Sequence, residues 1–72
     1  MKVTNSAAFG QAVRQRRKEL GYTQSFLAGF TGLSVSFISD LENGKSTIEL
    51  ERSLMLANTL GLDCFLQPRE KA

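Results

Sequence analysis

Short polar side chains recur at helical spacing in the segment TGLSVSFISDLENG, residues 31–44. At about 100° per residue, Ser36, Asp40 and Asn43 fall on one face of a helix, and Ser39 lies at the edge of that face. Hydroxyl, carboxylate and amide groups can donate to or accept from base edges in the major groove of DNA. The spacing therefore indicates a helix that reads DNA, although most exposed helix faces are polar and this face alone would not decide the matter.

A carboxylate and a guanidinium fall where neighbouring residues predict burial. The opposite face of the same helix consists of Val35, Ile38 and Leu41. Glu42 lies among these apolar residues, and Arg17 lies in an apolar stripe one turn after Val13. Because an unpaired buried charge costs several kcal/mol, we expect Arg17 and Glu42 to pair with each other. The pair would be structural and would join two helices.

Candidate phosphate contacts come from a basic cluster and from a helix start. The first 36 residues carry five basic side chains and one acidic side chain, a net charge of +4, and the remaining residues carry −2. The cluster RQRRK contains Arg14, Arg16 and Lys18, which suit either the negative end of a helix dipole or a phosphate-facing patch. Gln24 follows Thr23, a good N-cap, so its amide and nearby backbone N–H groups can bind a phosphate. Arg14 and Lys45 are further candidates.

These side chains must be positioned by helices, and the chain predicts four of them. Their expected spans are 7–20, about 24–31, 35–43 and 49–60. The expected helix ends are Gly21, Gly32, Gly44 and Gly61. The inward residues are expected to include Phe9, Val13 and Leu20, then Phe26, Leu27 and Phe30, then Leu50, Leu54, Leu56, Ala57 and Leu60. Two short helices joined by a glycine-containing turn are typical of a helix-turn-helix, so the predicted fold is a small all-α bundle of four to five helices.

The C-terminal residues show a different pattern. In LDCFLQPR, Leu62, Cys64 and Leu66 alternate with Asp63, Phe65 and Gln67, which predicts a strand over residues 63–68. A lone strand in a helical chain has no partner, so we expect Cys64, Phe65 and Leu66 to pair with a second copy of the chain. A homodimer would also help a 72-residue domain, whose core alone supplies only about 3–5 kcal/mol.

Composition excludes several classes of protein. The 72 residues predict one domain, residues 1–72, and a single cysteine with no histidine excludes an intrachain disulfide and a four-ligand zinc site. No glycine-rich phosphate loop or catalytic constellation is present, so we expect no enzyme activity, metal or cofactor. The N-terminus MKVTNSAAFGQAV has no long apolar run, so we expect neither a signal peptide nor a membrane span, and a cytoplasmic protein.

The stretch VRQRRKELGYTQSFLAGFTGLSVSFISDLENGK resembles the Xre/Cro-type helix-turn-helix family, which includes lambdoid phage repressors. The matching residues are Arg17 before Leu20-Gly21, Thr23-Gln24, Leu27-Ala28, Gly32-Leu33-Ser34, Ile38-Ser39 and Glu42-Asn43-Gly44. The resemblance covers residues 9–62 and implies a lambda-repressor-like fold. It also implies that Gln24 and Asn43 contact phosphates, that Arg17 and Glu42 form a buried salt bridge, and that the bases are faced by Val35, Ser36, Ser39 and Asp40.

The tail STIELERSLMLANTLGLDCFLQPR is similar to the end of HipB-type antitoxins, in which a strand after the last helix pairs across the dimer. This resemblance implies a repressor of its own operon that binds double-stranded DNA at a near-palindromic operator and also binds a HipA-like kinase toxin. The base-facing positions depart from phage repressors, because Val35 is apolar and Asp40 is acidic where amides are common. The operator sequence therefore does not follow from the resemblance.

Two alternatives stay open at the level of sequence. The first is a restriction-modification controller or phage-type regulator, which would bind DNA and no protein toxin. The second is a module that keeps the fold and binds only protein. The basic cluster around Arg14 and the pair Gln24 and Asn43 favour DNA.

Overall fold

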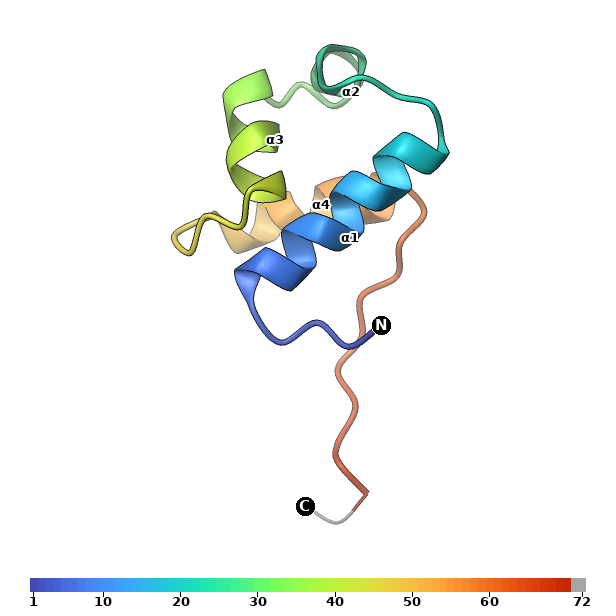
Figure 1. The fold of residues 1–72 in the computed structure, drawn as a ribbon, viewed down its shortest axis with the longest axis vertical. Coiled ribbons are helices and arrows are strands. Elements are labelled where there is room, and N and C mark those ends of the chain that lie inside the picture. The colour runs from blue at the N-terminus through green and yellow to red at the C-terminus, as the bar shows by residue number, and fades with distance from the viewer. Residues whose placement is uncertain (71–72) are drawn as a thin grey trace.

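The computed structural model describes residues 1–70, and within them it contains four helices that form a small bundle. The helices are α1 (Ser6–Glu19), α2 (Gln24–Thr31), α3 (Val35–Glu42) and α4 (Leu50–Thr59). Figure 1 shows α2 at one end of the bundle, α1 and α4 beneath it, and the C-terminal segment leaving from the opposite end. The four predicted helices are thus present, each within two residues of its expected limits.

Each helix begins at a side chain that accepts from its first turn. Asn5, Thr23, Ser34 and Glu49 are the N-caps, and their oxygens accept from backbone N–H groups at 2.7–3.0 Å. Such caps satisfy donors that have no partner inside the helix and fix where the helix starts. The starts of α2 and α3, which bound the turn between them, are therefore set by local chemistry.

The turn between α2 and α3 depends on Gly32. Its φ of 78° lies in the left-handed region, which glycine enters without the cost that a Cβ brings. Its N–H donates to the carbonyl of Ala28, and the chain reaches Ser34, the cap of α3, two residues later. The result is a tight helix-turn-helix, with α3 held at a fixed angle to α2.

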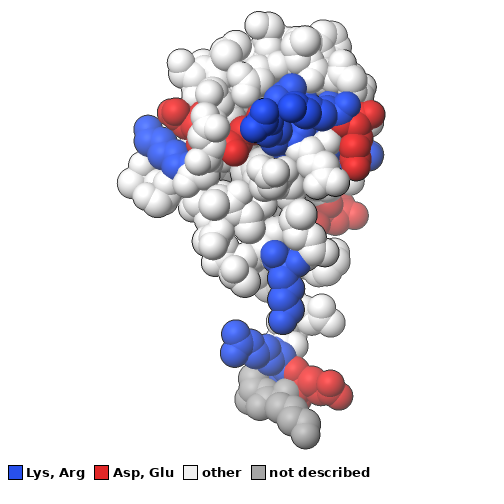
Figure 2. Space-filling model, in the orientation of Figure 1, with Lys and Arg blue, Asp and Glu red and all other residues white. Residues whose placement is uncertain are grey.

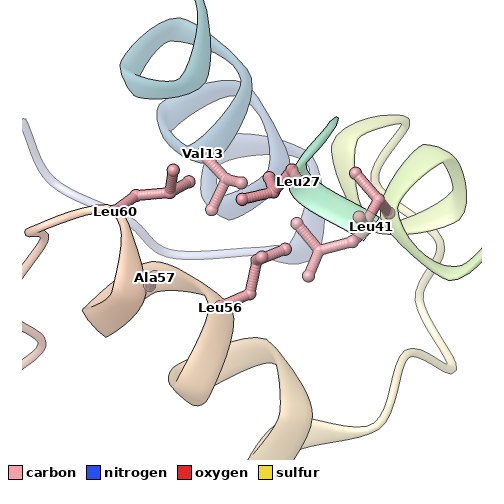
Figure 3. Close-up of a cluster of buried hydrophobic side chains, with 7 residues drawn as sticks. Val13, Leu27, Leu41, Leu56, Ala57 and Leu60 are labelled. Atoms are coloured by element: carbon pink, nitrogen blue, oxygen red, sulfur yellow. The ribbon is translucent and has the colours of Figure 1, made fainter. Parts of the chain in front are cut away.

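The core is a cluster of aliphatic side chains from all four helices. It consists of Val13, Leu27, Ile38, Leu41, Leu56, Ala57 and Leu60, each at most 1% exposed. Figure 3 shows most of these side chains meeting in the space between α1, α2, α3 and α4. Two of the buried residues belong to α3, whose inner side is therefore locked into the core.

Two helices approach each other closely at Gly10 of α1. A Cβ at this position would overlap the carbonyl oxygen of Leu41 and lie 2.9 Å from that of Glu42. The backbone of α1 therefore packs directly against the C-terminal end of α3. Gly10 lies inside a regular helix, so its backbone conformation does not require glycine. Glycine is required because there is no room for a Cβ.

The structure does not support the predicted strand over residues 63–68. No strand occurs in residues 1–70, and the segment is extended and irregular. Phe65 is 78% exposed and Leu66 is fully exposed, and Cys64 is exposed as well. A strand is defined by hydrogen bonds to a neighbouring strand, and one helical chain supplies no such neighbour. The alternating pattern therefore has nothing to pair with inside the chain.

Several residues predicted to face inward lie at the surface instead. Phe26 is 54% exposed, Phe30 is 71% exposed and Leu50 is 69% exposed. In α2 only Leu27 is buried, and it lies about 100° around the helix from Phe26. Because α2 is eight residues long, its pattern of apolar residues did not show which side would meet the core.

Candidate nucleic-acid interface

The outer face of α3 carries the four residues expected to face bases. Val35 is 42% exposed and Ser36 is also exposed, whereas Ser39 and Asp40 are half-buried. Ser39 accepts a hydrogen bond from the side-chain amide of Asn43, Nδ2 to Oγ 3.4 Å. Ser36, Ser39 and Asp40 lie on one side of the helix, as the spacing predicts, and form a short strip of donors and acceptors. Val35, which the spacing placed with the inward apolar residues, is instead exposed beside this strip.

Asp40 does not stand alone on this face. Its Oδ2 lies 3.4 Å from the Nζ of Lys45, and both side chains are about half exposed. The backbone N–H of Lys45 also donates to the carbonyl of Asp40 at 3.0 Å, which continues the chain tightly past the end of α3. The lysine thus offsets the acidic charge of Asp40 on this face.

Beneath the strip, Arg17 and Glu42 form a buried ion pair between α1 and α3. Arg17 Nε lies 2.7 Å from Oε2 of Glu42, and Nη2 lies 2.9 Å from Oε1, so the pair is bidentate. The remaining nitrogen, Nη1, donates to the carbonyl of Tyr22 at 2.8 Å. Hydrogen bonding to Glu42 raises the pKa of Arg17 above its usual value, although burial of the guanidinium opposes this. The guanidinium therefore stays charged and fixes the position of α3.

Gln24 joins the same network from the first turn of α2. Its Nε2 donates to Oε1 of Glu42 at 3.1 Å, and the side chain is only half-buried. The second N–H of this amide remains available for an acceptor. The Thr23 side chain accepts from the N–H of Phe26, and the first backbone bond of α2 is donated by Leu27. The N–H groups of Gln24 and Ser25 therefore have no partner within the helix. The arrangement suits an anion held against the start of α2.

The basic cluster of α1 divides into different roles. Arg16 donates from Nε to the carbonyl of Leu60 at 2.8 Å and pairs weakly with Glu19, so it ties α1 to the end of α4. Arg14 and Lys18 are exposed, and within residues 1–70 neither forms an ion pair. Figure 2 shows basic side chains across the face that α1 presents, away from the uncharged end of the molecule.

Sequence reasoning missed two of these contacts. It did not predict that Gln24 would donate to Glu42 or that Arg16 would bind the end of α4. Both contacts join residues distant in sequence, and no local pattern signals them. The Arg17–Glu42 contact was predictable only because both charges fall on apolar faces.

Residues 1–70 were compared with the requirements of a metal site and of a membrane-spanning helix. No group of three or more histidine, cysteine, aspartate or glutamate residues there lies close enough to hold a metal ion. No helix of the described chain is long and apolar enough to cross a membrane.

Comparison with curated proteins gives two close relatives. The chain is 38% identical over 71 residues to an uncharacterised HTH-type transcriptional regulator, y4mF, of Sinorhizobium fredii, covering 97% of this chain and 93% of that protein. It is 34% identical over 61 residues to an uncharacterised HTH-type transcriptional regulator of Haemophilus influenzae, covering 85% of this chain and 60% of that relative.

Solved structures give the same fold. A chain in a HipB–O4 20mer complex superposes with a TM-score of 0.85 at 26% identity, over 97% of this chain and 99% of that one. A chain in a complex of a HipB variant with an O2 20mer superposes with a TM-score of 0.86 at 24% identity, over 97% of both chains. The helix-turn-helix family matches residues 13–65, which include α2, the turn and α3. By fold, sequence and the geometry of α2 and α3, the chain belongs to the helix-turn-helix family and resembles HipB.

Proposed function

We propose that the protein is a sequence-specific DNA-binding transcriptional repressor that acts as a homodimer. The observation that carries the proposal is the strip of Val35, Ser36, Ser39 and Asp40 on the outer face of α3, in a helix-turn-helix whose inner side is locked into the core. The similarity to HTH-type transcriptional regulators and to HipB–20mer complexes supports it.

In this proposal α3 lies in the major groove, and the residues that contact DNA divide into two sets. Ser36, Ser39 and Asp40 contact base edges, and Val35 offers an apolar contact to a thymine methyl. The phosphates are held by Gln24, Asn43, Arg14 and Lys45. Of these, Gln24 has the strongest structural support, because Glu42 orients its amide beside the start of α2.

The dimer would form at the end of the molecule where the tail leaves. A groove of about 600 Å³ lies there between the N-terminal segment, α1, α4 and the tail. Its apolar lining includes Phe9, Leu54, Phe65 and Leu66. A second tail lying antiparallel to the first would give residues 63–68 the strand partner that one chain lacks and would cover these side chains.

The biological role we propose is that of an antitoxin in a HipBA-like operon. The protein would repress its own operon from a near-palindromic site and bind a HipA-like kinase toxin. As a DNA regulator it would act in the cytoplasm, without enzymatic activity of its own. The support is the fold shared with HipB. A gene for a kinase-like protein beside this one would distinguish this role from that of a restriction-modification controller or phage-type regulator.

The experiment is a gel shift of the full chain on its own promoter at two salt concentrations. We expect a discrete complex with the promoter, weaker binding to unrelated DNA, and a loss of affinity at the higher salt because phosphate contacts release counterions. Equal binding to promoter and unrelated DNA would contradict sequence-specific binding, and no binding to either would favour a module that binds only protein.

A further inference from the structure

Three aromatic side chains form a row on the outer side of α2. Phe26 and Phe30 lie four residues apart in the helix and therefore share one side of it, and Tyr22, which precedes the helix, contacts Phe26. The ring centroids of Tyr22 and Phe26 are 5.1 Å apart, and those of Phe26 and Phe30 are 6.4 Å apart and nearly parallel. Their exposed fractions are 37%, 54% and 71%. We call Tyr22, Phe26 and Phe30 the aromatic row.

The surface around the aromatic row carries no charge. Residues 20–39 contain no lysine, arginine, aspartate or glutamate. Figure 2 shows the end of the molecule where α2 lies as free of charged side chains in this view. At Gly29, beside Phe30 in the sequence, an added Cβ would meet open space, so the surface there is accessible. Two copies of such a surface can meet without repulsion between like charges.

The position of the aromatic row indicates which surface it would meet. The helix that carries Phe26 and Phe30, α2, lies at the end of the molecule opposite the tail (Figure 1). In the proposed dimer the tails meet at the two-fold axis, so the two aromatic rows lie at the outer ends of the dimer. Two palindromic sites placed side by side are related by a two-fold axis midway between them. The aromatic row of one dimer would therefore face the same row of the next dimer.

The size of the aromatic row sets the strength of such a contact. Scaled by their exposed fractions, the three rings offer on the order of 300 Å². A stable interface needs about 800 Å² from each partner. The contact is therefore too small to hold two dimers together in solution, but it can act when DNA holds both dimers at high effective concentration.

We propose that the aromatic row is a contact between neighbouring dimers, through which occupancy of one operator raises the affinity for an adjacent operator. This inference rests on the proposed function and adds a second copy of the chain as the partner of α2.

The test is a footprinting titration of the full chain on duplexes carrying one site or two adjacent sites, the site being selected first from random DNA with the wild-type protein. The variant changes Phe26→Ser and Phe30→Ser together. The control is Met55→Ser, which makes the same kind of change at a 38% exposed position on α4. Duplexes in which the spacing changes by about 5 base pairs place the two dimers on opposite faces of the helix.

We expect wild type and Met55→Ser to bind paired sites at least about tenfold more tightly than a single site at the favourable spacing, an advantage lost at the half-turn spacing. The double variant should lose this advantage and keep single-site affinity within about twofold of wild type.

Single-site binding without any advantage for paired sites would overturn this inference and leave the proposed function intact. A double variant that stays cooperative, or that loses single-site binding, would also overturn it. If the double variant instead abolished binding of a co-expressed kinase-like protein while paired sites gave no advantage, the aromatic row would be the binding surface for that protein, and this inference would be overturned. Absence of binding to every duplex would contradict the proposed function and this inference together.

Discussion

Glu42 holds two residues at once. It accepts two hydrogen bonds from Arg17 and one from Gln24, while its side chain is almost fully buried. The carboxylate therefore fixes the distance between α1 and α3 and orients an amide toward the proposed phosphate site. Because Glu42 pairs with Arg17 and also orients Gln24, we expect its loss to affect both the stability of the domain and the proposed DNA binding.

The first prediction concerns this carboxylate. Glu42→Gln leaves Arg17 buried without its counter-charge, and we expect it to lower the free energy of unfolding by about 3–5 kcal/mol, measured by urea denaturation. Glu19→Gln is the control, because its pair with Arg16 is exposed and 3.5 Å long, and it should change little. An unchanged melting temperature for Glu42→Gln would show that the site is wet or the pair is absent.

Lys45 tests the phosphate contacts. Lys45→Ala should weaken binding to all DNA sequences alike and reduce the slope of log K against log salt by about 0.9, the value for one phosphate contact. Arg52→Ala, which removes the same charge from an exposed position on α4, is the control and should leave the slope unchanged. A Lys45→Ala protein with wild-type slope would mean that the lysine serves only Asp40.

At this scale, the sequence predicted where charges must pair but not how many partners each would have. Arg17 and Glu42 were predictable because burial of a lone charge is costly. The hydrogen bond from Gln24 to Glu42 was not predictable, because a neutral amide at a half-buried position does not need a charged partner. Resemblance to a family supplied the proposed base and phosphate roles, which the residue pattern alone left undecided.

Among the elements, α1 and α3 pack through a glycine. Gly10→Ala would place a Cβ against the backbone carbonyls of Leu41 and Glu42, which cannot move away easily. We expect it to lower the free energy of unfolding by about 1–3 kcal/mol, measured by thermal or urea unfolding. The matched change is Gly29→Ala, which meets nothing within 4 Å and should raise stability by up to about 1 kcal/mol. Equal effects of the two changes would contradict the close packing of α1 on α3.

The limits of the helices were predictable because they depend on local signals. Caps such as Thr23 and Ser34 and the glycine at position 32 fix ends through hydrogen bonds and backbone conformation within a few residues. The inward faces were less predictable. Phe26 and Phe30 were expected inside, but the core formed around Leu27, and only the arrangement of α1, α3 and α4 decides between these two sides of α2.

For the whole molecule, the tail tests the proposed dimer. Leu66 is fully exposed in the single chain, so Leu66→Asp should not harm the folded monomer. It should weaken dimer affinity strongly, because the side chain would be covered by the second copy. Sedimentation at several concentrations measures this, with Gln67→Asp, whose side chain alternates to the other face, as the control. A Leu66→Asp protein that sediments like wild type would contradict a dimer formed through residues 63–68.

The strand expected in the tail depends on a partner strand that the sequence of one chain does not supply. Alternation in residues 62–67 signals a strand, yet a strand exists only when its backbone groups have a partner. The alternation therefore predicts that residues 63–68 pair with a second copy of the chain, and this pairing requires two chains. If the tails do pair across a two-fold axis, the two α3 helices should lie about 34–36 Å apart, one turn of DNA, and the operator should be a near-palindrome.

The central claim is that the outer face of α3 reads bases, and the most direct measurement is a titration of Ser36→Ala and Asp40→Ala against the operator and its single-base variants. We expect each substitution to change the preferred base at one position in each half-site by about 1–3 kcal/mol, with little change in the salt slope. If both variants keep the base preferences of the wild type, α3 does not read the sequence and the account is wrong.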